Sequence, residues 1–224
     1  MKEYLDIRDL KSWLKKSAEL IEGNREYLSE LDSHSGDGDH GANLSRGFQA
    51  LMKSEETTRS ETLASYLESV GALLGDRIGG SYGALLGLFF KGMAVASEGK
   101  EQLEREALAK AFEVGKDAIF SIGKAKLGDK TMVDALLPAI QALQRESNLG
   151  EALEKAALEA SKGAERTKTM KASLGRARFL GERSIGAQDA GATSMALLLR
   201  ALWVSYQSDC GSASRQCRPT QGRS

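Results

Sequence analysis

The chain has 224 residues, which is enough for one large domain, or two small ones, with a buried core. Hydrophobic residues make up 41% and charged residues 28% of the chain, values typical of a globular protein. The 31 basic and 31 acidic residues cancel, so no global charge attracts nucleic acid or an anionic membrane, and any anion site must be built locally.

The N-terminal segment MKEYLDIRDL lacks the apolar core of a secretory signal. The longest apolar stretch, 84–96, is interrupted by Lys91 and is too short to span a bilayer. Both cysteines, Cys210 and Cys217, lie in a polar C-terminal segment, so the rest of the chain has none to cross-link. These features predict a cytoplasmic protein that binds neither membrane nor nucleic acid.

Apolar residues recur at three- and four-residue steps along most of the chain, as Leu10, Trp13, Leu14 and Ile21 do, which indicates amphipathic helices. The predicted helices are 8–22, 24–31, 42–53, 60–75, 81–97, 102–122, 131–145, 149–170 and 191–207. The first two could be one kinked helix, so about eight are expected, and no strand-like alternation is present. We therefore predict an all-α protein with one domain, 1–207, and a polar, disordered tail, 208–224.

Glycine clusters between the predicted helices, and the first cluster contains Asp32, Asp37 and Asp39 in LDSHSGDGDHGANLSRGF. Carboxylate oxygens are hard ligands for magnesium or calcium, and three neighbouring carboxylates repel one another unless a cation lies between them. The alternative is a solvated acidic turn, because aspartate and glycine are common turn residues. The flanking His40 and Asn43 favour the metal site.

Three familiar phosphate or metal motifs are excluded. The glycines at 36, 38 and 41 match the spacing GxGxxG, but no strand precedes them and acidic residues lie between them, unlike a dinucleotide-binding turn. The calcium-loop spacing is wrong and its closing glutamate is absent. The sequence also contains no GxxxxGK[ST] loop.

Three later junctions are also rich in glycine, which suits phosphate binding at helix N-termini. RIGGSYGALLGLFF, 77–90, is either a phosphate-binding turn or a close helix crossing. LGDKTMVDALLPA, 127–139, reads as a helix start whose Lys130 could face a pocket. In GRARFLGERSIGAQDAGATSMALLL, 175–199, Arg176 and Arg178 are candidates either for phosphate contacts or for surface ion pairs.

The segments GDGDHGANLSRGF, GGSYGALLGLFF, GKAKLGDKTMVDALLPA and GRARFLGERSIGAQDAGATS occur in this order. Together they resemble the nucleotide-binding L subunit of bacterial dihydroxyacetone kinase, and the resemblance extends to about residue 207. It implies a single-domain barrel of about eight antiparallel helices, with the nucleotide site in the loops at one end.

The resemblance also implies the site residues. Two Mg2+ ions would be held by Asp32, Asp37 and Asp39, and the nucleotide would be ADP or ATP. The phosphates would lie against the residues His40, Gly41, Ala42, Asn43, Ser81 and Tyr82. Gly123 and Met132 would border the adenine, while Arg176, Asp189, Ala190 and Gly191 would lie near the nucleotide and close over it. Many relatives have a small hydroxyl residue where this chain has Tyr82.

The implied function is the phosphoryl-donating subunit of a dihydroxyacetone (glycerone) kinase, with no catalytic acid or base of its own. The sugar would be held by a partner subunit. In one branch of the family a phosphotransferase-system protein rephosphorylates bound ADP, and in the other ATP is consumed; the sequence leaves this choice, and a homodimer, open. The alternatives are a kinase subunit for another short ketose and an ADP-dependent module that controls a transcription factor.

Overall fold

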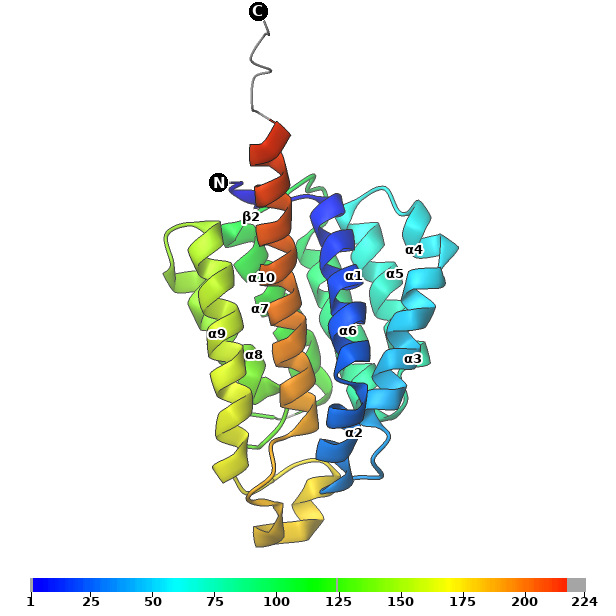
Figure 1. The fold of residues 1–224 in the computed structure, drawn as a ribbon, viewed down its shortest axis with the longest axis vertical. Helices are drawn as coiled ribbons and strands as arrows, with labels where there is room; N and C mark the ends of the chain where they lie inside the picture. Colours follow the sequence, from blue (N-terminus) through cyan, green and yellow to red (C-terminus); the bar gives the residue numbers. More distant parts are fainter. Residues whose placement is uncertain (1, 124, 217–224) are drawn as a thin grey trace, which may run out of the picture.

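The computed structural model describes residues 2–123 and 125–216, and helices make up most of them (Figure 1). The prediction of an all-α protein is confirmed. The long helices are α1 (Ile7–Gly23), α3 (His40–Lys53), α5 (Leu63–Arg77), α6 (Gly80–Ala96), α7 (Arg105–Ile122), α8 (Val133–Arg145), α9 (Leu149–Arg166) and α10 (Ala190–Gln216). Shorter elements in the connections are α2 (Arg25–Ser33), α4 (Glu55–Arg59), η1 (Thr167–Thr169) and η2 (Arg176–Ser184).

The long helices form a closed ring. Helix α1 packs on α3, α3 packs on α5, each later helix packs on the next, and α10 returns to α1. Neighbours run in opposite directions, so the predicted antiparallel barrel is confirmed (Figure 1). Because the direction alternates, α3, α6, α8 and α10 all begin at the lower end in Figure 1, and their N-termini gather there.

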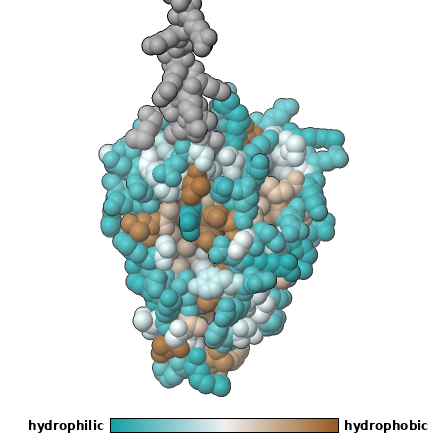
Figure 2. Space-filling view, viewed as in Figure 1, coloured by the Kyte–Doolittle hydropathy of each residue, from teal (hydrophilic) through white to brown (hydrophobic). Residues whose placement is uncertain are grey.

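Large aromatic side chains fill the middle of the barrel. The ring of Trp13 lies 5.6 Å from that of Phe90 and 6.1 Å from that of Phe112, and Phe89 lies 5.3 Å from Phe112. The indole nitrogen of Trp13 donates to the carbonyl oxygen of Leu198 at 2.8 Å, so its polar atom is satisfied. These contacts join α1, α6, α7 and α10, while the face shown in Figure 2 is mainly hydrophilic.

Side-chain caps fix where several helices begin. At α1 the Asp6 carboxylate accepts from the backbone N–H groups of Arg8 and Asp9, and the Asp9 carboxylate accepts from the Asp6 N–H at 2.5 Å. Asn148 caps α9 through the Glu151 N–H at 2.9 Å. Such caps satisfy amide groups that have no partner within the helix.

Two short strands were not predicted. β1 (Tyr4–Leu5) pairs antiparallel with β2 (Leu103–Glu104) at the end of the barrel opposite the gathered N-termini (Figure 1). Helix α7 therefore begins at Arg105 and not at 102. Two residues per strand are too few to show an alternating pattern in the sequence.

The predicted helix ranges also fail at two other places. The short helix α4 (Glu55–Arg59), capped by Ser54, was missed. Helix α10 continues past 207 to Gln216, so the predicted range 191–207 was too short. The last part of the predicted disordered tail, 217–224, lies outside the described residues. Among the residues described, no helix is long and apolar enough to cross a membrane.

Candidate functional site

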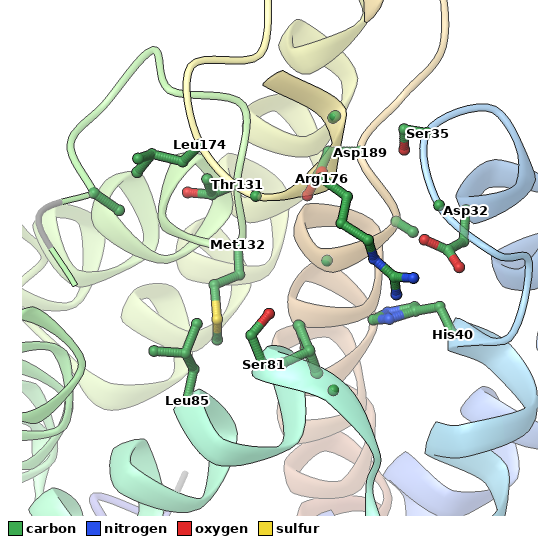
Figure 3. Close-up of a pocket in the computed structure, with 18 of the residues that line it drawn as sticks. Asp32, Ser35, His40, Ser81, Leu85, Thr131, Met132, Leu174, Arg176 and Asp189 are labelled. Atoms are coloured by element: carbon green, nitrogen blue, oxygen red, sulfur yellow. The ribbon is translucent and has the colours of Figure 1, made fainter. Parts of the chain in front are cut away.

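A cavity of about 550 Å³ opens at the end of the barrel where α3, α6, α8 and α10 begin (Figure 3). Of the fifteen predicted site residues, thirteen line it: Asp32, Asp37, Asp39, His40, Asn43, Ser81, Tyr82, Gly123, Met132, Arg176, Asp189, Ala190 and Gly191. Segments far apart in the sequence therefore meet at one place, as the motifs predicted. The volume is typical of a small-molecule site.

The two predicted residues outside the cavity lining are Gly41 and Ala42. Gly41 is buried where α3 crosses the start of α2, and a Cβ atom there would lie 1.9 Å from the Arg25 carbonyl oxygen. Only glycine permits this approach, so Gly41 has a packing role that accounts for it without a ligand.

Three carboxylates form a candidate metal centre at the edge of the cavity. One oxygen from each of Asp32, Asp37 and Asp39 lies within 4.8 Å of the others, and in the described part of the chain no other trio of possible ligands comes together in this way. Asp32 lies in the last turn of α2, and its Oδ2 accepts from the N–H groups of Gly38 at 2.9 Å and Asp39 at 3.2 Å. These bonds fold the loop back so that Asp37 and Asp39 face Asp32.

Arg176 reaches this centre from the first residue of η2. Its Nη1 lies 2.5 Å from Oδ2 of Asp37, and both side chains are more than half exposed. The guanidinium group holds the pKa of Asp37 below its ordinary value. The cavity thus has an arginine directly beside the carboxylates that are suited to a divalent cation.

His40, the first residue of α3, is held in place from two sides. Its Nε2 lies 3.0 Å from the Ser194 hydroxyl of α10, and its ring meets that of Tyr82 edge to face, with centroids 4.7 Å apart. Burial lowers the pKa of His40, against the opposing effect of the Asp32 and Asp39 carboxylates. A histidine held in this way presents a fixed polar edge to the cavity.

Tyr82 points its hydroxyl group into the protein. The hydroxyl oxygen is buried and makes no hydrogen bond within the described residues, although the Ser194 hydroxyl lies near it. Burial raises the pKa of Tyr82 above its ordinary value. The ring therefore contributes a wall of the cavity beside His40.

Asp189 caps the last helix. Its Oδ2 accepts from the Ala192 N–H at 2.7 Å, and its own N–H donates to the Thr167 hydroxyl at 2.8 Å. Burial raises the pKa of Asp189 to about 6. These bonds fix Ala190 and Gly191, which open α10 at the cavity wall.

One side of the cavity is apolar, and most of this side was not predicted from the sequence. Besides Met132, it is lined by Leu85, Ile119, Ile122 and Leu174. In Figure 3 the labelled Leu85, Met132 and Leu174 lie on the side away from Asp32, His40 and Arg176. Single apolar residues at helix ends and in loops carry no sequence signal that separates them from ordinary core or surface positions.

The two sides of the cavity therefore differ in polarity. Its apolar side suits a flat, weakly polar ring system, and its other side has carboxylates, an arginine and helix N-termini. Four helix N-termini at one site attract negative charge, because the amide N–H groups and the helix dipoles point toward it. Anionic oxygens bridged to carboxylates by a cation fit this side.

The chain is similar in sequence to known proteins. Residues 34–204 match the family model described as the DAK2 domain. The ADP-binding subunit DhaL of the PEP-dependent dihydroxyacetone kinase of Escherichia coli is 39% identical over 195 residues, covering 85% of this chain and 93% of that protein. The L-erythrulose kinase of Pectobacterium atrosepticum is 32% identical over 217 residues, covering 94% of this chain and 37% of that protein.

A solved structure is similar as well. The crystal structure of the dihydroxyacetone kinase from C. freundii in complex with AMP-PNP and Mg2+ superposes with a TM-score of 0.68 at 26% sequence identity. The match covers 86% of this chain and 33% of that longer chain.

Proposed function

Because this chain belongs to the DAK2-domain family, we propose that it is the ADP-binding, phosphoryl-donating subunit of a dihydroxyacetone kinase. The observation that carries the proposal is the joint presence, in one cavity, of the aspartate trio, Arg176 and an apolar wall. A nucleoside diphosphate needs these features, since its phosphates require a cation and its base requires apolar contacts.

The adenine lies against the apolar side formed by Leu85, Met132 and Leu174 in this proposal. The phosphates lie toward the N-termini of α3, α6 and α10, where Asn43, Ser81 and Gly191 border the cavity. Backbone N–H groups there donate to phosphate oxygens. In this proposal Arg176 contacts the terminal phosphate, on which charge develops during transfer.

The three aspartates fit magnesium by their chemistry. They offer hard oxygen donors within 4.8 Å of one another, and phosphate oxygens would complete the coordination. Bound Mg2+ neutralises phosphate charge in phosphoryl transfer. We propose two ions, because three carboxylates and two or more phosphate groups offer more oxygen ligands than one octahedral ion accepts.

The sugar that accepts the phosphoryl group is proposed to be held by a second protein. The chain has two histidines, and His40 is held by Ser194 and Tyr82, while His34 is exposed with its Nδ1 2.9 Å from the Glu30 carbonyl oxygen. His40 lines the cavity that is proposed to hold the nucleotide, and His34 is solvent-exposed, so neither is proposed to bind a triose covalently. A partner subunit that carries dihydroxyacetone would therefore dock at the cavity mouth, in the cytoplasm where ADP and ATP are available.

The test uses the purified full chain. Calorimetry should show ADP binding in Mg2+ and none in EDTA. Dihydroxyacetone should not be phosphorylated by the chain alone, and turnover should appear when a dihydroxyacetone-binding subunit is added with ATP or with a phosphotransferase-system donor. Turnover of free dihydroxyacetone by the chain alone, with contamination excluded by mass spectrometry, would contradict the two-subunit mechanism.

A second acceptor is favoured by one observation. The similar kinases include the L-erythrulose kinase of Pectobacterium atrosepticum, so another short ketose is the alternative substrate. Because the ketose is held by the partner, exchanging the partner subunit should change the acceptor while this chain stays the same.

A further inference from the structure

Lys130 stands in an unusual backbone conformation beside the cavity. Among the described residues it is the one non-glycine residue with a positive φ, 61°. The carboxylate of Asp134, fully buried, holds the turn by accepting from the N–H groups of Gly128 at 2.6 Å and Thr131 at 2.8 Å. A left-handed conformation is unfavourable for a residue with a Cβ, so it persists where surrounding contacts demand it.

The Lys130 residue is buried, with 4% of its surface exposed, and its ammonium group donates hydrogen bonds to backbone carbonyl oxygens. The Nζ atom donates to the carbonyl oxygens of Met170 at 3.3 Å, Ala187 at 2.6 Å and Ser184. An ammonium group has three N–H donors, and each has an acceptor here. Lys130 therefore touches the cavity wall, but its charge is turned toward the loop.

The three acceptors lie on both sides of η2. Met170 precedes this segment, and Ser184 and Ala187 end or follow it, so one side chain ties the two ends of the loop together. The preceding residue, Asp129, adds a second tie, because its Oδ1 accepts from the Ser173 hydroxyl at 2.5 Å. Between these ties lies Arg176, which reaches the aspartate trio.

We propose that Lys130 is a positioning residue for phosphoryl transfer, which fixes the Met170–Ala187 loop so that Arg176 faces the phosphates. The proposal rests on the proposed function for the role of Arg176. The physical argument is that a buried ammonium group and a left-handed backbone both cost free energy. The contacts of the ammonium group go to the loop that carries the arginine and not to the barrel core.

The decisive substitution is Lys130→Met, which keeps the length of the side chain and removes its donors. The matched control is Lys126→Met in the same turn, because Lys126 is exposed and its side chain makes no hydrogen bond or ion pair within the described residues. We expect Lys130→Met to lower kcat with the partner subunit by about tenfold or more, with a smaller change in KM for the nucleotide, since Arg176 acts on developing charge. Lys130→Arg, which restores donors, should recover part of the loss.

A double-mutant cycle with Arg176→Ala separates positioning from general stability. If Lys130 acts through Arg176, Lys130→Met should change kcat less than twofold in the Arg176→Ala background. An equal loss in both backgrounds, or no loss in the parent, would overturn the proposal. Should Lys130→Met fail to fold, Ser173→Ala enters the same cycle, since it removes the hydroxyl bond to Asp129 Oδ1 and leaves the cavity lining intact. A full loss in both backgrounds would again overturn the proposal.

Limited proteolysis gives a readout that does not depend on catalysis. Trypsin should cut after Arg176, Arg178 or Arg183 several times faster in Lys130→Met than in the parent and in Lys126→Met. Unchanged cleavage would contradict the tie between Lys130 and the loop. Calorimetry of the parent with ADP and Mg2+ tests the proposed function separately, because absence of binding there would refute that function whatever the cleavage rates show.

Discussion

The Nη1 atom of Arg176 lies 2.5 Å from Oδ2 of Asp37, across 139 positions of sequence. The two residues come from the loop before α10 and the loop before α3, so this contact joins the two loops at the cavity. The same carboxylate belongs to the aspartate trio. The Asp37 carboxylate can therefore serve either the guanidinium group or a metal ion, so the two cations compete for it.

Replacing Arg176 should consequently have two effects of opposite sign. In Arg176→Gln the Asp37 carboxylate loses its cationic competitor, so Mn2+ should bind the nucleotide-free protein more tightly. The gain should be no more than a few-fold, because exposed ion pairs contribute little. Turnover with the partner subunit should fall. Mn2+ titration followed by electron paramagnetic resonance measures the first effect, and weaker Mn2+ binding would contradict the competition.

Neutralising two members of the trio should remove Mg2+-dependent nucleotide binding. We expect Asp37→Asn combined with Asp39→Asn to weaken ADP binding by about a hundredfold or more, since each carboxylate supplies a metal ligand. The control is Glu55→Gln combined with Glu56→Gln in α4, which removes two exposed charges at the other end of the barrel. Equal calorimetric affinity of the two double variants would show that the trio holds no metal.

The raised pKa of Asp189 predicts how the stability of the protein depends on pH. Burial raises its pKa from 3.8 to about 6, so ionising it is less favourable in the folded than in the unfolded protein. The protonated side chain therefore stabilises the folded protein below pH 4, and this contribution is lost as the pH rises toward 6. The free energy of unfolding falls by up to about 3 kcal/mol over this range, at about 1.4 kcal/mol per pKa unit.

Asp189→Asn removes this titration and keeps a side-chain oxygen for the Ala192 N–H. The difference in Tm, variant minus parent, should increase between pH 4 and pH 7 when measured in EDTA. A difference that stays constant with pH would contradict the raised pKa.

An exposed ring beside the cavity mouth should matter for the partner. Phe179 follows Arg176 in η2, is 75% exposed, and has the Arg178 guanidinium 4.6 Å from its ring centre. Since the acceptor must reach the terminal phosphate, we expect this ring to be covered when the partner docks. Phe179→Ala should raise KM for the partner about tenfold and leave ADP affinity unchanged. Val95→Ala, exposed at the other end, should change neither.

The end of α10 should be dispensable beyond Gln207. In Figure 1 the helix projects past its neighbours there. A chain ending at Gln207 should keep its Tm within about 1 °C and its nucleotide affinity. A chain ending at Trp203 is the control, because it loses the buried Tyr206, whose hydroxyl donates to the Lys2 carbonyl oxygen at 2.5 Å. That chain should melt several degrees lower, and equal losses in both would show that the end of α10 stabilises the barrel.

The sequence predicted the parts of the molecule that repeat or cluster. Stripes such as Leu10, Trp13 and Leu14 mark long helices, because burial on one face imposes a period. The glycine-rich junctions marked the loops that meet at the cavity, and the aspartates among them marked the candidate metal centre. Those features are local, so they are visible in the chain order.

What the sequence did not predict depends on contacts between distant segments. The pairing of Tyr4–Leu5 with Leu103–Glu104 has no local period. The apolar wall around Leu85 forms where α6, the end of α7 and the turn before α8 meet at the cavity. Likewise, Lys130 appeared able to face a pocket, and the structure shows its charge bound by carbonyl groups 40 to 57 positions away.

The strand pair at the far end of the barrel has a consequence for how the domain can be joined to others. β1 near the start of the chain and the end of α10 both lie at the pole opposite the cavity (Figure 1). A linker attached at either end would therefore leave the molecule away from the mouth, and the chain could be fused to a second domain, or anchored to a solid support, without obstructing ligand entry.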